Sequence, residues 1–388
     1  MAGRGIGAMT KREFLKTLGL AAFALGYPLE LGAGATPRTS SPSPVRTKNW
    51  VWMTPKLDIS ATELKRSFAV MRASGIDAVT AEIYNGQHAF YRSRRFPVKA
   101  EWLETVLPLA AAEHLEVHAW MWTMPCLLPD VISKHPDWYN VNAKGESAVD
   151  KPAYVDYYKF LDPARPEVRE FIRGTVHELA EVSGLAGIHL DYVRHPDAIL
   201  PKGLWAKYGI VQDRVYPPYD YGYTPYSRGV FKAKHGVDPL TLPDPESNPD
   251  WMQYRLDSVV DLVNDYLVPA AHAGGKMITA AVFPGPSLAK IMVRQDWGRF
   301  KLDAFLPMLY HRFYEAGPDW VKTFTEEAVA TVTAPVYSGL YVAPLDEAEF
   351  SKTVALALQG GAGGVSIFDA GAMNPDRWKT LASAVARG

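Results

Sequence analysis

The sequence predicts a (β/α)8 TIM barrel of the α/β class, with long loops after strands three and four. Short apolar segments typical of strands alternate with amphipathic segments typical of helices from residue 49 to the end of the 388-residue chain, which is the pattern of βαβ units. Eight strand segments occur, the number that closes a parallel barrel. Hydrophobic residues make up 48% of the composition, so the chain can bury a core of this size.

The expected strands are short apolar runs, and each is followed by a segment with helical spacing of its apolar residues. The strands cover residues 49–54, 76–84, 115–122, 187–191, 277–283, 303–310, 335–342 and 364–368. The helices cover residues 60–75, 102–112, 166–184, 251–273, 318–330, 346–358 and 375–386. Ser60 and Glu63 form a capping box at the start of the first helix, and Pro166 suits the first turn of the third.

Two connections are too long to be plain barrel loops: residues 125–165 after strand three and 196–248 after strand four. Loops of this length inside a compact domain usually form lids or binding surfaces. The second contains Tyr216–Tyr226, in which tyrosine alternates with proline and glycine. Two interpretations are open here: a disordered low-complexity segment, or an aromatic wall on which sugar rings stack.

Composition excludes some classes of partner. The formal net charge of −1 provides no field that would attract nucleic acid or a membrane surface, so neither is expected as a partner. The single cysteine, Cys126, excludes an intramolecular disulfide and the usual thiolate metal site. We therefore expect no metal and no cofactor.

The N-terminus predicts export. Residues 1–35 carry basic residues, then the apolar run Leu18–Leu25, then Ala33-Gly34-Ala35 as a small-residue cleavage site. Thr10–Lys16 is similar to a twin-arginine signal with lysine in the first arginine position, so twin-arginine and Sec export are both open. Residues 36–48 are rich in Ser, Pro and Thr and predict a linker, which leaves 49–388 as the catalytic domain of a periplasmic or secreted protein without a membrane anchor.

The strand segment that begins at Gly187 carries the strongest indication of function. This segment ends at Asp191, an acidic residue, and Pro196 soon after it prevents further hydrogen bonding to a neighbouring strand. Charged side chains at the carboxyl ends of barrel strands are usually functional, so Asp191 is predicted to be catalytic. His189 shares its face by strand alternation, while Tyr192 and Arg194 belong to the other face.

Several motifs, in order, resemble the family-10 glycosyl-hydrolase-like proteins. The resemblance covers roughly residues 48 to 385 and is carried by Ala89–Ser93, Val117–Trp120, Gly187–Pro196, Trp251 with Arg255, Arg294–Trp297 and Asp303–Tyr310. It implies export, a divergent barrel and hydrolysis of glycosidic bonds in a polysaccharide or cell-wall glycan. Glu82, Tyr84 and His88 depart from the residues expected of the family at these positions.

Glycoside hydrolysis needs two carboxyl groups across the scissile bond. Asp191 is the first, and Glu82 and Asp369, near the ends of strands two and eight, are the candidates for the second, with Glu82 ranked first. Strand five ends at Pro284 without an acid. Substrate-binding roles are expected of aromatic, histidine and arginine side chains at strand ends: Tyr84, His118, Trp120, Trp122, His189, Arg194, Tyr310 and His311.

Two other functions compete with this one. A barrel metallohydrolase would recruit His118, His189, Asp191, His311 and Asp369 as ligands, although strand one lacks the histidine pair that such sites normally use. A non-catalytic carbohydrate-binding barrel would keep the aromatic rim without needing Asp191.

Overall fold

A computed structural model describes residues 48–386 of the protein. The predicted export signal and residues 36–47 of the predicted linker lie outside the described residues. The described residues form one compact unit. No described helix is both long enough and apolar enough to cross a membrane.

Eight parallel strands form the centre of this unit, and all eight predicted strand segments are confirmed. They are β1 (Trp50–Met53), β2 (Ala78–Tyr84), β3 (Glu116–Trp122), β4 (Gly187–Asp191), β5 (Met277–Val282), β6 (Ala304–Pro307), β7 (Ser338–Tyr341) and β8 (Val365–Phe368). Their spatial order is β6-β5-β4-β3-β2-β1-β8-β7. Parallel bridges from Phe305 to Val336 and from Met308 to Gly339 join β6 to the β7 segment, so the sheet closes into the predicted (β/α)8 barrel.

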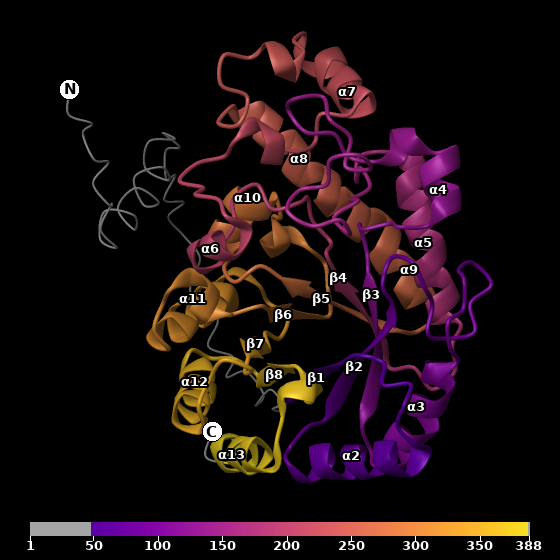
Figure 1. Cartoon of the computed structure of the whole chain (residues 1–388), viewed down its shortest axis with the longest axis vertical. Coiled ribbons are helices and arrows are strands. Elements are labelled where there is room, and N and C mark those ends of the chain that lie inside the picture. The colour runs from indigo at the N-terminus through magenta and orange to yellow at the C-terminus, as the bar shows by residue number, and fades with distance from the viewer. Residues whose placement is uncertain (1–47, 387–388) are drawn as a thin grey trace, which may run out of the picture. The chain divides into compact units, whose positions relative to one another are not determined.

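Helices surround the strands on the outside (Figure 1). The helices anticipated from the sequence are α2 (Ala61–Ala73), α3 (Trp102–Ala112), α5 (Pro166–Ala180), α8 (Pro249–Asp261), α9 (Val268–Ala273), α11 (Asp319–Thr331), α12 (Glu347–Gln359) and α13 (Pro375–Val385). Between α8 and α9 the chain forms a π-helical turn, Leu262–Leu267, within the segment expected as one helix. The Ser60–Glu63 capping box is present at the start of α2.

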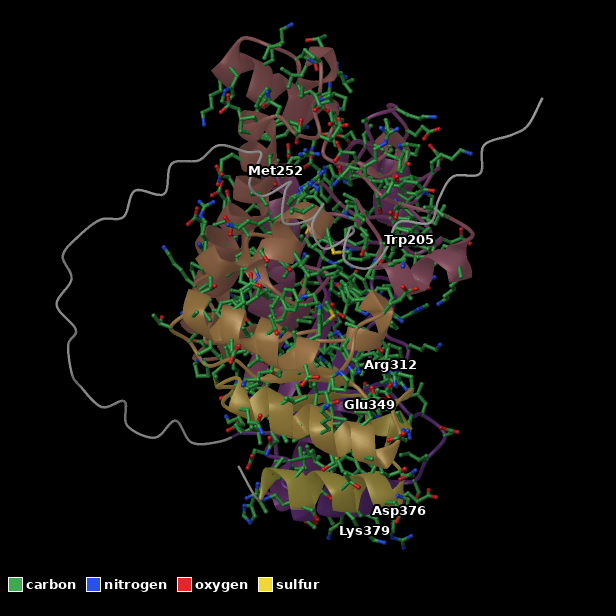
Figure 2. All side chains as sticks on the ribbon, turned by 90° about the vertical axis from the view of Figure 1, so that its left-hand side faces the viewer. Trp205, Met252, Arg312, Glu349, Asp376 and Lys379 are labelled. Carbon is green, nitrogen blue, oxygen red and sulfur yellow. The ribbon has the colours of Figure 1, made fainter. Side chains whose placement is uncertain are left out.

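Helix α10 (Pro286–Val293) and three shorter or peripheral helices, α4 (Pro129–Lys134), α6 (Trp205–Tyr208) and α7 (Pro225–His235), were not anticipated. The last three belong to the two long connections. Ion pairs on the outer surface join neighbouring elements, for example Arg312 with Glu349 of α12, or close a turn of one helix, as Lys379 with Asp376 does in α13 (Figure 2).

The barrel interior and the helix-covered face have separate cores. Inside the barrel, Trp50, Trp52, Trp120 and Tyr337 pack together with small residues of other strands. The larger core fills the space between strands and helices and includes Val51, Val79, Ile188 and Leu190. This division follows strand alternation, because successive residues of each strand point into the barrel and out toward the helices.

The tyrosine-rich segment of the second long loop fits neither interpretation given by its composition. Tyr221 and Tyr223 are 2% and 1% exposed, and Asp220, which directly precedes Tyr221, pairs with both Arg255 of α8 and Arg294 at the end of α10. These residues therefore pack against the body of the protein and stabilise the loop. Within the same segment, Tyr219 stacks on Tyr154 of the first long loop, with ring centroids 4.7 Å apart.

Candidate active site

A cavity of about 550 Å³ opens at the carboxyl ends of the strands. The cavity is lined by side chains from each of the strands β1–β8 or the turn that follows it, and by side chains from both long loops. The lining consists of Trp52, Thr54, Glu82, Trp120, Trp122, Tyr154, Tyr158, Asp191, Tyr192, Arg194, Asp197, Leu200, Pro201, Leu204, Tyr208, Ala281, Phe283, Pro284, Met308, Tyr310, Phe313, Tyr314, Tyr341 and Phe368. A cavity at this end of a barrel is where such folds place their chemistry.

Asp191 is the last residue of β4 and lies on the floor of the cavity. Its Oδ2 accepts a hydrogen bond from the Trp120 indole N–H (3.1 Å), and its Oδ1 accepts one from the Tyr192 backbone N–H (2.7 Å). Burial raises the pKa of Asp191 to about 6, against the opposing effects of the Tyr192 N–H, the Arg194 charge and the Trp120 N–H. The strand ends because Tyr192 adopts a left-handed backbone conformation, with φ of 52°.

Glu82, near the end of β2, lies in the same cavity and is 9% exposed. Burial is the main cause that raises its pKa to about 7, and the negative charge of Asp191 adds to it, while Trp122 acts in the opposite direction. The two carboxyl groups are therefore close enough for the charge of Asp191 to make Glu82 ionise less readily.

Tyr84 does not share the inward face of Glu82, contrary to the expectation from strand alternation. The register of β2 against β3 shifts between Glu82 and Tyr84, and such a bulge turns the following side chain to the other face. Tyr84 is 3% exposed, stacks on Phe96 at 4.2 Å and is absent from the cavity lining. We therefore do not propose a substrate-binding role for Tyr84.

Asp369, the other candidate for the second carboxylate, lies just after β8. Its Oδ1 accepts a hydrogen bond from the Ala372 backbone N–H (3.1 Å) and so caps the short helical turn Ala370–Ala372. It does not line the cavity. Of the two candidates, the structure brings Glu82 beside Asp191.

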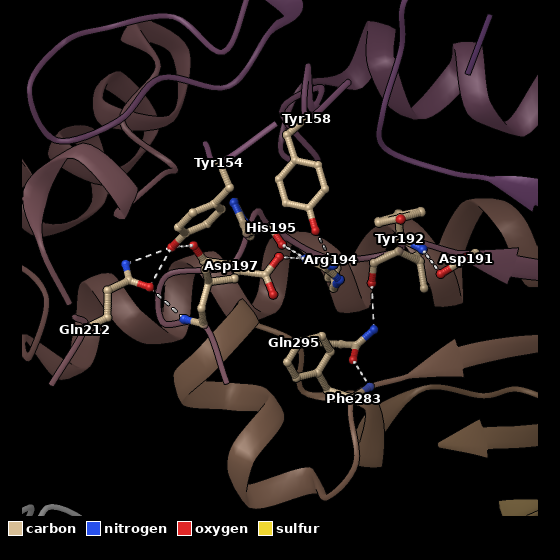
Figure 3. A network of polar contacts seen from close by, with 12 residues as sticks. Tyr154, Tyr158, Asp191, Tyr192, Arg194, His195, Asp197, Gln212, Phe283 and Gln295 are labelled. Atoms are coloured by element: carbon tan, nitrogen blue, oxygen red, sulfur yellow. Dashed lines mark hydrogen bonds and ion pairs between the residues drawn. The ribbon is translucent and has the colours of Figure 1, made fainter. Parts of the chain in front are cut away.

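Arg194 was expected from the sequence to bind substrate, and in the structure its side chain pairs with Asp197. Nη1 donates to Asp197 Oδ2 at 2.9 Å, and both side chains are 5% exposed. Figure 3 shows this pair with Tyr154 near Asp197 and Tyr158 near Arg194. The Tyr154 hydroxyl donates to the Asp197 carbonyl oxygen at 2.8 Å, so the pair is held by the first long loop as well as by its own.

The three histidines named from the sequence lie in different places. His189 is fully buried beneath the cavity: its Nε2 accepts from the Trp52 indole N–H (3.0 Å), its Nδ1 lies 2.9 Å from Thr279 Oγ1, and burial lowers its pKa to about 3. His118 is fully buried toward the opposite end of the barrel, 3.3 Å from Glu116. His311 pairs with Glu349 at 2.9 Å.

None of these histidines lines the cavity, so a direct substrate contact is not proposed for them. Within residues 48–386, no group of three or more His, Cys, Asp or Glu side chains is arranged to hold a metal ion. The ligand set imagined for a metallohydrolase is therefore not assembled in the described part of the chain.

Trp120, Trp122 and Tyr310, all predicted from strand ends, do line the cavity. The sequence reasoning missed the aromatic residues contributed by loops, chiefly Tyr154, Tyr158 and Phe313, together with Asp197. A signal existed for Asp197, because it stands three residues after Arg194 in the same turn, a spacing at which an ion pair closes readily.

Comparison with known proteins agrees with this architecture. Residues 49–199 match the family model described as "Glycosyl hydrolase-like 10". A search of curated proteins found no match. Among solved structures, the PgaB (BpsB) glycoside hydrolase domain from Bordetella bronchiseptica is 13% identical, with a TM-score of 0.67 over 87% of this chain and 98% of that one.

The catalytic domain of β-amylase from Paenibacillus polymyxa is 14% identical, with a TM-score of 0.62 over 88% of this chain and 98% of that chain. A β-galactosidase from the psychrophilic Marinomonas ef1 is 16% identical, with a TM-score of 0.57 over 88% of this chain and 59% of that chain. These likenesses show the fold. The resemblance predicted from the motifs is confirmed: residues 49–199, which hold Glu82 and Asp191, match the glycosyl hydrolase-like 10 family, on a barrel shared with solved glycosidases.

Proposed function

We propose that this protein is an exported glycoside hydrolase that cleaves glycosidic bonds in an oligo- or polysaccharide with Asp191 and Glu82 as its two carboxyl groups. The observation that carries the proposal is that these two carboxyls line one aromatic cavity, with pKa values raised to about 6 and about 7. Two carboxyls that titrate near neutral pH, one after the other, are what acid-assisted glycosidic cleavage requires.

The surroundings of the two groups suggest their roles. The Asp191 carboxylate receives two N–H donors and the nearby Arg194 charge, all of which favour its ionised form. Glu82 has the higher pKa, so Glu82 keeps its proton to a higher pH than Asp191 does. We assign Glu82 as the general acid that protonates the leaving oxygen, and Asp191 as the anion that attacks the sugar or activates water.

The remaining lining residues suit a carbohydrate. Trp122 and Tyr310 present aromatic faces at the cavity, and such faces pack against the C–H face of a sugar ring. Trp120 holds Asp191 in place by its N–H. His189 stays neutral beneath Trp52, whose N–H it accepts, so it contributes packing and orientation below the reacting groups.

Export is part of the proposal and rests on residues 1–35 of the sequence alone. We expect the mature protein to begin near Thr36 and to be found in the periplasm or outside the cell. N-terminal sequencing of the protein recovered from these fractions checks this, and recovery of residues 1–30 intact would contradict it.

The activity is tested by incubating the mature protein with peptidoglycan and with plant and algal polysaccharides, followed by analysis of released oligosaccharides. Asp191→Asn protein is the matched control. Release by the wild type only is the expected result. Retention on a polysaccharide without any release would instead indicate a carbohydrate-binding barrel.

The same assay is repeated after treatment with a strong chelator. We expect release to continue, because the carboxyl pair needs no metal ion. Loss of release that zinc restores would favour a metallohydrolase.

A further inference from the structure

One side of the cavity differs from its floor. Leu200, Pro201, Leu204 and Phe313 all line the cavity, and we call these four residues the apolar wall. The first three come from the loop after β4, with Leu204 in the 3-10 turn Lys202–Leu204. Phe313 lies in the 3-10 turn His311–Tyr314 after β6.

The two turns that carry the apolar wall are locked together. A Cβ atom at Gly203 would lie 2.7 Å from the Phe313 carbonyl oxygen and 2.8 Å from that of Arg312, so only glycine permits this approach. Lys202 pairs with Glu315 at 2.8 Å across the same junction. The wall is therefore continuous from one loop to the other.

The backbone of the wall is also fixed from behind. The Leu200 N–H donates to Gln212 Oε1 (2.8 Å), and the Leu200 carbonyl oxygen accepts from the Trp205 indole N–H (2.9 Å). Gln212 in turn donates to the Tyr154 hydroxyl (2.8 Å), as Figure 3 shows. Since both backbone groups of Leu200 are already bonded, Leu200 offers its apolar side chain to the cavity.

The side chains of the four wall residues carry no group that binds a sugar hydroxyl, and the tyrosine hydroxyls of the lining belong to other residues. Charged residues in the described lining are Glu82, Asp191, Arg194 and Asp197, and the last two pair with each other. The described lining includes no Asn, Gln, His, Lys or Ser. A bare sugar unit against the wall would leave hydroxyls without partners, which costs free energy for each one, whereas a hydrocarbon group gains from burial there.

We propose that the apolar wall is a subsite for a hydrocarbon substituent, so that a saccharide carrying an alkyl or aryl group binds more tightly than the same saccharide without it. This rests on the proposed function only in placing that group beside the bond that is cleaved. The wall itself binds hydrocarbon whether or not the protein hydrolyses anything.

The test is a binding series in which the sugar is constant and the hydrocarbon grows: methyl, butyl, hexyl and octyl β-D-glucopyranoside, each below its micellar concentration. Quenching of tryptophan fluorescence reports binding, because Trp52, Trp120 and Trp122 line the cavity. We expect Kd to fall with chain length, by up to about fourfold for each methylene buried, until the wall is covered.

Leu204→Asp places a charge on the wall and should make Kd independent of chain length. The control is Val211→Asp, the same kind of change on the same loop at a side chain that is 69% exposed and outside the cavity; it should keep the wild-type series. A flat wild-type series, or an unchanged slope in Leu204→Asp, would overturn the proposal. Hydrolysis of the same glycosides, measured in parallel, separates the glycosidase proposal from the subsite proposal. A Kd that falls with chain length without any hydrolysis contradicts only the glycosidase proposal. Hydrolysis with a Kd independent of chain length contradicts only the subsite proposal.

Discussion

Glu82 and Glu116 lie on neighbouring strands of one barrel, and their surroundings differ sharply. Glu116, at the start of β3, accepts hydrogen bonds from Lys48 Nζ at 2.7 and 2.8 Å and from His118 Nε2 at 3.3 Å. His118 first, and then Lys48, lower the pKa of Glu116 to about 2. Glu82, near the other end of β2, is buried beside Asp191, and its pKa is raised to about 7.

The difference shows how one fold separates stability from chemistry. At the amino ends of the strands a carboxylate is given cations and donors, so it stays ionised at every ordinary pH and holds Lys48 and β3 together. At the carboxyl ends Glu82 is placed without a cation beside another acid. Such a placement costs stability, and proteins keep it mainly where the protonated form is used.

The largest effect is expected from Asp191→Asn, which should lower turnover by at least about a hundredfold. The amide keeps the shape and the packing but cannot carry the negative charge that attacks or stabilises the transition state. Saccharide binding and the melting temperature should change little. Retention of more than about a tenth of the wild-type rate would show that Asp191 is not a catalytic residue.

The second largest loss of turnover is expected for Glu82→Gln, and the size of this loss should depend on the leaving group of the substrate. With a natural sugar leaving group, loss of the general acid costs about a hundredfold or more, whereas a dinitrophenyl glycoside needs no protonation and should be cleaved at a rate near that of the wild type. Asp369→Asn is the matched control and should fall less than tenfold on both substrates. If Asp369→Asn loses the greater factor, the assignment of the second carboxyl is reversed.

The pH dependence of kcat/KM should be a narrow bell. Its acidic limb reflects ionisation of Asp191 near pH 6, and its basic limb reflects loss of the proton from Glu82 near pH 7. In Asp197→Asn, Arg194 loses the carboxylate that faces it at 2.9 Å. The uncompensated guanidinium then favours ionised Asp191, and the acidic limb should move to lower pH by about one unit. An unchanged limb would mean that Arg194 and Asp197 act only in packing.

Much of the candidate site could be predicted from the sequence, because several of its residues stand at the carboxyl ends of strands. The position of Asp191 follows from an apolar strand that stops in front of Pro196, and Trp120 reaches Asp191 because β3 and β4 pair in register, with Trp122 opposite Asp191. Local patterning determines such positions directly. The eight strands were predictable for the same reason.

Other parts of the site depend on contacts that patterning does not encode. Tyr84 does not lie on the inward face of β2 with Glu82, because a bulge shifts the register of β2 between these two residues. His311 turned to Glu349 because the chain coils into a 3-10 turn directly after Tyr310. The apolar wall forms only where two loops, more than a hundred residues apart in sequence, meet at Gly203.

The last expected effects are on stability, and they distinguish the two ends of the barrel by sign. A carboxyl whose folded pKa is raised stabilises the fold while it is protonated, and this contribution is lost as the pH rises through the folded value. For Glu82, raised from 4.5 to about 7, the penalty develops between pH 4.5 and about pH 7 and is constant above that. Glu82→Gln removes it, so the stability of the variant relative to wild type should increase across this range, by up to about 3 kcal/mol.

Glu116→Gln should behave in the opposite way. The lowered pKa of Glu116 means that its contribution is present above 4.5 and is lost only as the pH falls toward about 2. Because its side chain is 42% exposed, solvent screens the ion pair, and the variant should be less stable by at most about 1 kcal/mol. That difference should stay constant from pH 5 to pH 8, while turnover remains within about twofold of wild type because Glu116 lies outside the cavity. Melting curves of both variants at pH 5, 6.5 and 8 check this. Parallel pH trends for the two substitutions would remove the physical basis for assigning proton chemistry to one end of the barrel and structural support to the other.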